Sequence, residues 1–352
     1  MASMFSVPKK QHKTPSEKPS VRLLQAGVVW TVTSGILLLL ILSSVSIGSV
    51  RYSIPEVFRA LVGLEDGPIR VIVVILRLPR VVLAMLIGAS LATAGALLQA
   101  VMRNPLASSY TLGVSSGASL GASLVIFYGA VLPIAANIAL PVMGFLFGLG
   151  TIVLTLAIAQ KLDVQMQNYT IILVGMVFSL FVNAITTLLS AMSHEHIQRL
   201  LFWQMGSFAM KDWSVIGILV PVTIIGTLFI THYHRELDMM TFGEDQAKTM
   251  GVNLKTVKYN LLFVSAALTG SAIAFCGVIG FVDLVVPHIV RKIFGAAHRY
   301  VIPMSAVFGG VFMVMCDLIA RTIVSPSELP VGAITAIIGA PFFAYIFFVG
   351  RK

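Results

Sequence analysis

The chain has 352 residues, of which 57% are hydrophobic and 11% are charged, and its mean hydropathy is +0.95. Soluble domains carry about 25% charged residues, so this composition excludes a soluble globular protein. The formal net charge of +10 comes from scattered basic residues, which favours orientation against a lipid surface over binding to nucleic acid.

The first segment, residues 1–26, is polar and basic. Its lysines and Arg22 outnumber a single acidic residue, Glu17. The apolar run that follows lacks the small-residue cleavage pattern of a signal peptide. We therefore expect a disordered cytoplasmic tail over 1–26 and a polytopic transmembrane domain over 27–352.

The longest uncharged run extends from Asn104 to Gln160. The hydrocarbon core of a bilayer is about 30 Å thick, and a helix needs about 20 apolar residues to cross it. The run is therefore long enough for two spans, with the turn between them at Leu132-Pro133.

Charge-poor apolar runs predict about ten transmembrane helices in an all-α integral membrane fold. The seventh and eighth are hard to separate, because Tyr259 to Val282 is uncharged, and the eighth is short for a full span. The ten ranges are 27–48, 80–102, 110–130, 137–160, 168–191, 214–231, 258–278, 281–294, 301–322 and 333–350.

An even number of spans places both termini on the same side of the membrane. With the N-terminus inside, the inner segments hold 16 Lys and Arg residues and the outer segments hold 8. The positive-inside rule thus predicts cytoplasmic termini. Five of the outer basic residues fall within residues 49–80, an exception that requires a reason.

Small residues recur at helical spacing within the spans. In lipid, close backbone approach supplies much of the packing energy, so tight helix packing is the favoured interpretation and pathway lining the alternative. Residues 77–117 and 262–295 also resemble each other weakly and would run in opposite directions, as in the inverted repeats of transporters. The glycines concerned are Gly88, Gly113, Gly117 and Gly121.

Several motifs occur in order along the chain: Arg77-Leu-Pro-Arg80, Gly243-Glu-Asp-Gln-Ala-Lys-Thr-Met-Gly251, Phe281-Val-Asp-Leu-Val-Val-Pro-His288, Asp317-Leu-Ile-Ala-Arg321 and Glu328-Leu-Pro-Val-Gly332. Together they resemble the FecCD-type permeases over roughly residues 28–350. That family comprises the membrane subunits of ATP-binding-cassette (ABC) importers for iron-siderophores, haem and cobalamin. The resemblance implies a type II ABC importer permease fold.

The resemblance also implies a docking role for Arg77, Arg80 and Arg321. In the family, arginines at these positions hold glutamates of the substrate-binding protein. A guanidinium group suits this task because it donates two parallel hydrogen bonds to a carboxylate. The alternative for Arg77 and Arg80 is that they anchor a helix end among lipid phosphates.

Residues 232–258 resemble the cytoplasmic coupling segment that the family inserts into its ATPase subunit. We expect Ala247 and Met250, three residues apart, to pack inward, and Glu244 to lie near a helix start, where the helix dipole favours it. The alternative is an ordinary solvated loop. The coupling residues are Gly243, Glu244, Ala247, Met250 and Gly251.

Isolated polar residues within or near the spans give weaker signals. We expect His288 to be a packing residue, and His194 and His196 to lie in a solvated loop without metal. Asp283 departs from the family pattern, in which glycine is common. We expect it to cap its own helix, and a substrate or proton role is the alternative.

No GxxxxGK[ST] motif occurs in the chain, and no nucleophile–base pair stands out, so we expect neither enzymatic activity nor a cofactor. The leading hypothesis is a cell-membrane permease for an iron(III)-siderophore complex, paired with ATPase subunits, an extracellular binding protein and a second permease, identical or paralogous. Haem and cobalamin are alternative cargoes. An ion-coupled secondary transporter would need paired membrane carboxylates, and Asp283 and Asp317 are the only candidates. A membrane enzyme would need a polar cluster that is absent.

Overall fold

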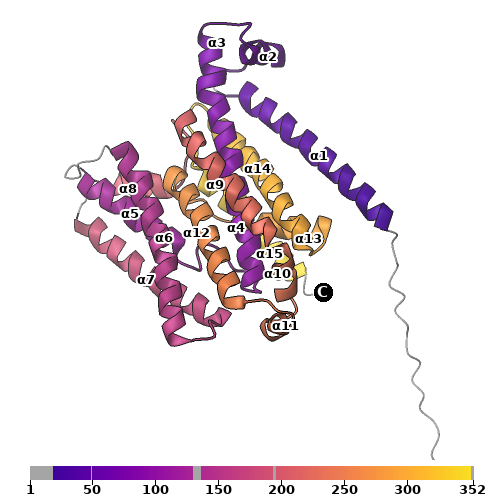
Figure 1. The fold of residues 1–352 in the computed structure, drawn as a ribbon. Coiled ribbons are helices and arrows are strands. Elements are labelled where there is room, and N and C mark those ends of the chain that lie inside the picture. The colour runs from indigo at the N-terminus through magenta and orange to yellow at the C-terminus, as the bar shows by residue number, and fades with distance from the viewer. Residues whose placement is uncertain (1–18, 49, 130–135, 193–195, 350–352) are drawn as a thin grey trace, which may run out of the picture.

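A computed structural model describes residues 19–48, 50–129, 136–192 and 196–349 of the chain. Over these residues every regular element is a helix, which confirms the all-α fold class (Figure 1). Each of the ten expected ranges overlaps one of the ten longest described helices. These are α1 (Pro19–Ser46), α4 (Leu78–Val101), α5 (Val114–Tyr128), α6 (Ala136–Leu162), α7 (Asn168–Met192), α9 (Trp213–His232), α12 (Leu254–Cys276), α13 (Val282–Phe294), α14 (His298–Thr322) and α15 (Val331–Val349).

Short helices connect the long ones. They are α2 (Ile54–Val62), α3 (Pro68–Arg70), the π-helix η1 (Val71–Arg77), α8 (Ile197–Gln204), α10 (His234–Met240) and α11 (Glu244–Thr249). Elements α3, η1 and α4 form one continuous helix that projects beyond the bundle and carries α2 at its tip (Figure 1). Elements α10 and α11 lie at the opposite end.

Six of the described helices are long and apolar enough to cross a membrane. They lie at Pro68–Val101, Ile138–Leu162, Asn168–Met192, Trp213–His232, Leu254–Cys276 and His298–Thr322. Three shorter apolar helices accompany them, at Thr31–Ser46, Val114–Tyr128 and Val331–Tyr345. Helix α13 has 13 residues, in agreement with its expected shortness.

One expected boundary differs from the structure, and two expected segments lie outside the described residues. Helix α1 begins at Pro19, so residues 19–26, which were expected to belong to the tail, are helical. The rest of that tail, residues 1–18, and the Leu132-Pro133 turn lie outside the described residues.

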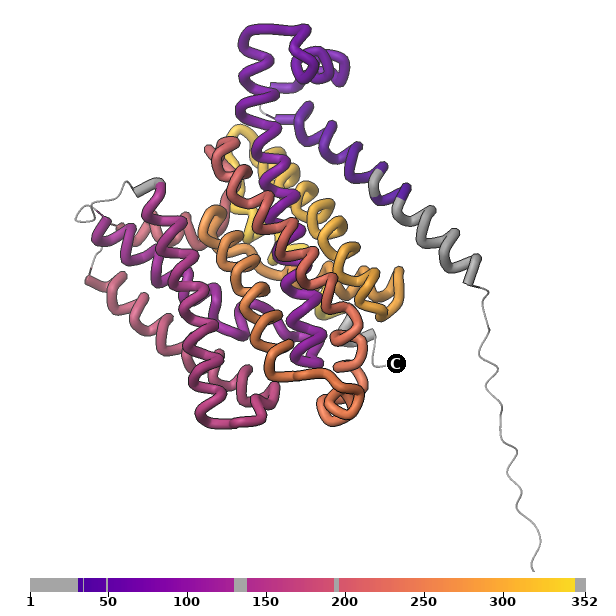
Figure 2. Tube along the Cα trace, in the orientation of Figure 1, coloured from indigo at the N-terminus to yellow at the C-terminus, as the bar shows by residue number. Residues whose placement is uncertain are grey.

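Helix α4 forms the centre of the bundle, where it packs against α9, α12, α13 and α14 (Figure 2). It approaches α14 closely, because a Cβ on Gly88 would overlap the carbonyl oxygen of Gly309, and a Cβ on Gly309 would overlap that of Gly88. Glycine at both positions lets the two backbones touch, which is how helices gain packing energy in lipid.

A second close contact joins α5 and α6. A Cβ on Gly117 would overlap Thr151, and a Cβ on Gly121 would overlap the carbonyl oxygen of Met143. Gly113 is the residue before α5 and has a φ of +85°, and a Cβ there would also crowd Thr151. The three glycines therefore share this contact face, although only Gly117 and Gly121 lie within the helix.

The boundary that the sequence left open between α12 and α13 is a break over residues 277–281. Gly277 has a φ of +78° and Phe281 a φ of +69°. A side chain at residue 277 would also overlap the carbonyl oxygen of Trp203, so glycine is required there on both counts.

Helices α4 and α12 run in opposite directions. The last residue of α4, Val101, accepts a hydrogen bond from Asn168, while Lys258 in the first turn of α12 contacts Met166, two residues before Asn168. The end of α4 therefore lies near the start of α12. This arrangement is the one that an inverted repeat requires.

Candidate functional site

One end of the bundle, here called the arginine end, holds an ion-pair network. Arg80, at the start of α4, donates to both oxygens of Asp317 with N–O distances of 2.8 to 3.2 Å. Its other terminal nitrogen donates to Glu328 at 2.8 Å. Asp317 is fully buried, whereas the Glu328 side chain is 42% exposed. One guanidinium thus joins α4 to α14 and to the loop before α15.

The two remaining arginines of the predicted docking set join the same end to α1. Arg321 lies 3.2 Å from Asp317 and donates to the carbonyl oxygen of Ser44 at 2.7 Å. Arg77 donates to the carbonyl oxygens of Val45 and Ser46. These contacts hold the last turn of α1 against η1 and α14.

All three guanidinium groups are turned into the protein. Arg77 and Arg321 are each 7% exposed, and Arg80 is 9% exposed. A carboxylate from another protein would therefore have to replace an existing acceptor, and Glu328 is the most exposed of these. The sequence pattern found the arginines, but not their acceptors. Only the Asp317–Arg321 pair, four apart on one helix, has a local signal.

The opposite end, here called the α11 end, holds the predicted coupling segment. Gly243 precedes α11 with a φ of +124°, and Gly251 follows it with a φ of +91°. Side chains rarely adopt these angles, so the two glycines bound a helix of six residues. The centre of the segment is therefore helical.

The two expected inward residues of this segment differ. Ala247 is fully buried, but Met250 is 53% exposed, so its predicted inward packing is wrong. The reason is that α11 ends at Thr249, and helical spacing no longer determines the direction of the next side chain. Met250 is instead an apolar side chain on the surface.

Glu244, the first residue of α11, forms an ion pair with Lys258 of α12 at 2.9 Å. The Lys258 side chain is 1% exposed and also donates to the carbonyl oxygen of Met166 at 2.8 Å. Met166 lies in the turn between α6 and α7. One buried ammonium group therefore contacts α11 and the α6–α7 turn, while its backbone belongs to α12.

The α6–α7 turn is organised by Asp163. Its carboxylate accepts hydrogen bonds from the backbone of Gln167 and Gln165 and from the Thr170 hydroxyl. The pKa of Asp163 is lowered, chiefly by the hydrogen bond from the backbone of Gln167. The hydrogen bonds from Gln165 and Thr170 and the charge of Lys258 lower this pKa further. The turn is thus held by an ionised carboxylate.

A further contact attaches α10 to the start of α14. The Asp238 carboxylate accepts from the backbone N–H of His298 at 3.0 Å and lies 2.7 Å from its ring Nδ1. Together with the Glu244–Lys258 pair, it fixes both short helices of the α11 end to long helices of the bundle.

The isolated polar residues have the following surroundings. Asp283 lies in the first turn of α13, but its carboxylate accepts from the backbone N–H of Ser109 at 3.2 Å, so it ties α13 to the loop before α5.

His288 is half-buried, and its Nε2 has no hydrogen-bond partner among the described residues. His194 lies outside the described residues. Within them, no three His, Cys, Asp or Glu side chains gather as a metal site would require.

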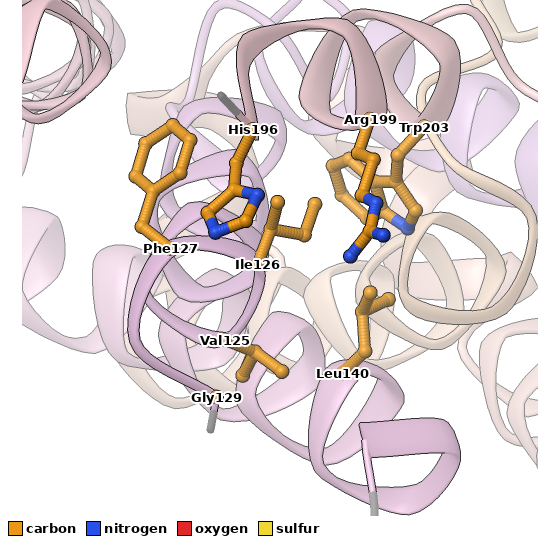
Figure 3. A pocket seen from close by; sticks show the side chains of 8 residues that line it. All are labelled: Val125, Ile126, Phe127, Gly129, Leu140, His196, Arg199 and Trp203. Atoms are coloured by element: carbon orange, nitrogen blue, oxygen red, sulfur yellow. The ribbon is translucent and has the colours of Figure 1, made fainter. Parts of the chain in front are cut away.

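A pocket of about 370 Å³ lies where α8 packs on the end of α5 (Figure 3). Its polar side is formed by His196 together with Arg199 and Trp203 of α8, and its other wall is mostly apolar. Sequence reasoning did not bring these residues together and missed this pocket. Its lining residues are Val125, Ile126, Phe127, Gly129, Leu140, His196, Arg199 and Trp203.

The sequence model of the FecCD transport family matches residues 36–348. The chain belongs to the FecCD transport family. It is 41% identical to the uncharacterised ABC transporter permease protein YvrB of Bacillus subtilis (strain 168), covering 87% of this chain and 89% of YvrB. It is 37% identical to the Fe(3+) dicitrate permease FecD of Escherichia coli (strain K12), covering 77% and 83%.

The fold of this FecCD-family chain also matches a solved structure. The inward-facing structure of an ABC transporter assigned to the metal-chelate type superposes with a TM-score of 0.81 and 29% identity, covering 94% of this chain and 99% of that one. Other relatives are named as permeases for cobalamin, hemin and molybdate. This chain is therefore a multi-pass ABC importer permease of the cell membrane and is not itself an enzyme.

Proposed function

We propose that this permease moves an iron(III)-siderophore complex across the cytoplasmic membrane. The observation that carries the proposal is the likeness, over 94% of the chain, to a transporter assigned to the metal-chelate type. The FecD relative, named for Fe(3+) dicitrate, supports the same class of cargo. A chelate already fills the coordination shell of its iron, so the permease needs no metal ligands of its own.

The arginine end faces outward in this proposal and receives the binding protein. Arg77, Arg80 and Arg321 outnumber the two carboxylates of this region, Asp317 and Glu328, and Glu328 is the exposed one. A glutamate of the binding protein would take the place of Glu328, which costs little because one ion pair replaces another. The acceptors bound by Arg77 and Arg80 also explain why basic residues occur in the outer segment 49–80, against the positive-inside rule.

The α11 end faces the cytoplasm and receives the ATPase. A short helix with Met250 exposed beside it offers the small apolar surface that fits a groove on a partner. The N-terminal end of α1 points to this same side (Figure 1). Cytoplasmic termini, as the positive-inside rule predicts, agree with that orientation.

A second permease, identical or paralogous, would complete the pathway. Helix α7 exposes a row of large apolar side chains, among them Val177, Leu180 and Phe181. Lipid or a second copy would cover this face.

An ion-coupled secondary transporter is disfavoured by the state of its two candidate carboxylates. Asp317 already neutralises Arg80 and contacts Arg321, and Asp283 is held by the backbone of Ser109. Neither is free to bind and release a cation in each transport cycle. Cobalamin stays the second candidate cargo, because a cobalamin permease relative is 37% identical to this chain, as FecD is.

The cargo is tested by uptake in cells that lack their own iron-chelate importers and carry this permease with its ATPase and binding protein. The panel contains ⁵⁵Fe-labelled citrate, hydroxamate and catecholate complexes, haem, cobalamin and molybdate. Uptake of one ferric complex supports the proposal. Uptake of cobalamin, haem or molybdate alone would contradict the cargo and leave the importer assignment intact.

A further inference from the structure

We infer that Lys258 is a positioning residue that transmits displacement of α11 to the α6–α7 turn and thereby to α7. The inference rests on the proposed function of α11 as the ATPase contact and adds the route by which that contact reaches a membrane span. Its basis is a single buried ammonium group with acceptors on two separate elements.

The first contact of Lys258 is to α11. Its Nζ lies 2.9 Å from the Glu244 carboxylate, and Glu244 is the first residue of that helix. The lysine side chain is 1% exposed and the glutamate side chain 20% exposed. An unpaired buried ammonium is strongly unfavourable. When α11 is displaced, the Lys258 side chain must therefore move with it or pair with another acceptor.

The second contact is to the carbonyl oxygen of Met166, at 2.8 Å. Met166 is buried and has a φ of +52°, a backbone conformation that residues other than glycine rarely adopt. Asp163 fixes the same turn through its bonds to Gln165 and Gln167. A shift of the Lys258 ammonium therefore moves the turn as a unit rather than one side chain within it.

The turn leads directly into α7, which begins at Asn168. Only 28% of the apolar window of α7 is buried within the chain, whereas 67% of that of α12 is. Helix α12 is thus packed largely within its own subunit, whereas most of the apolar surface of α7 is not. The lysine lies on the more buried helix and links α11 to the turn that leads into α7.

Lys258 cannot itself be part of the ATPase interface, because it is buried beneath Glu244. Its replacement should therefore leave ATPase binding in place and change how much cargo is moved for each ATP hydrolysed. A purely structural ion pair would behave differently, because its loss would lower stability and leave the yield of transport for each ATP unchanged.

The test uses the complete complex of permease, ATPase and binding protein in proteoliposomes, with ATP hydrolysis and cargo uptake measured on the same vesicles. The variant Lys258→Met is compared with Lys255→Met, which removes an exposed lysine from the same first turn. Glu244→Ala removes the other partner of the same ion pair.

We expect uptake per ATP to fall about tenfold in Lys258→Met and Glu244→Ala, in the range of a typical coupling between sites, with the ATPase still bound. Lys255→Met should match the wild type. If Lys258→Met does not accumulate, Glu244→Ala carries the test, because its side chain is partly exposed.

The charge swap Lys258→Glu with Glu244→Lys distinguishes a link from α11 to the Met166 carbonyl from a simple ion pair between residues 244 and 258. It restores the ion pair but places a carboxylate against the Met166 carbonyl, so uptake per ATP should stay low. Normal uptake per ATP in Lys258→Met or Glu244→Ala, or its full recovery in the swap, would overturn the inference. A wild-type complex that shows no ATP-dependent uptake would instead overturn the proposed function.

Discussion

Arg80 and Asp317 are 237 positions apart in the sequence, yet their side chains form an ion pair at 2.8 Å in which both are buried. The pair joins α4 to α14 at the arginine end, and the Gly88–Gly309 contact joins the same two helices further along. These helices therefore form one rigid unit, in contrast to the thinly packed α7.

Asp317→Asn should destabilise the permease strongly. It leaves the buried Arg80 and Arg321 without their shared carboxylate, and removing one partner of a buried ion pair costs about 3–5 kcal/mol. We expect a markedly lower melting temperature of the detergent-solubilised protein. The matched control is Asp66→Asn, because the Asp66 side chain in the Arg70–Asp66 pair is 82% exposed. Equal melting temperatures for the two variants would contradict the network.

Gly309→Ala should also destabilise, for a steric reason. The added Cβ would overlap the Gly88 carbonyl, and overpacking of this kind costs about 1–3 kcal/mol. Gly217→Ala in α9 is the control, because a Cβ there meets nothing within 4 Å. Thermal unfolding followed in detergent measures both, and the account is wrong about this contact if Gly309→Ala is as stable as Gly217→Ala.

Met250→Asp should weaken binding of the ATPase subunit about fivefold, since an apolar interface anchor contributes about 1 kcal/mol or more. Met210→Asp is the control, because Met210 is an exposed methionine that lies between α8 and α9, away from α11. Co-purification of the ATPase from membranes measures the difference. Undiminished co-purification with Met250→Asp would place the ATPase contact elsewhere.

Glu328→Gln should tighten binding of the substrate-binding protein. The change removes the charge that competes for Arg80 while keeping a side chain of the same size. Binding of the purified partner to the permease in nanodiscs measures the affinity. Weaker binding in the variant would mean that Glu328 itself takes part in docking.

The α6–α7 turn should show a pH-dependent contribution from Asp163. Its pKa is lowered in the folded protein, mainly by the Gln167 backbone N–H. The stabilisation is therefore present above the unfolded value of about 3.9 and is lost as the pH falls through the folded value. Asp163→Asn should melt below the wild type at pH 7, and the gap should close in strongly acidic buffer. A gap that persists unchanged there would show that hydrogen bonding alone, without charge, holds the turn.

Much of the fold could be predicted from the sequence, because the length of an apolar run reports directly on a span. The break between α12 and α13 could not, since the run from Tyr259 to Val282 carries no charge and the break depends on backbone angles at Gly277 and Phe281. The start of α1 was misplaced because its first turns are polar.

The candidate site was predicted less completely. Motif resemblance located Arg77, Arg80 and Arg321, but their acceptors come from distant segments that no local pattern connects. Lys258 gave no signal either, because a lysine at a helix start is ordinarily exposed. The Met250 prediction was wrong because it extended helical spacing beyond the end of α11.

The most direct test of the account is cargo uptake into proteoliposomes that contain the permease, its ATPase and the binding protein. We predict that a ferric complex is taken up only when ATP is present on the side of the vesicle membrane that the α11 end faces. Uptake should stop when either the ATPase or the binding protein is omitted. Uptake by the permease alone, driven by an ion gradient without ATP, would contradict the assignment of this chain as an ABC importer subunit.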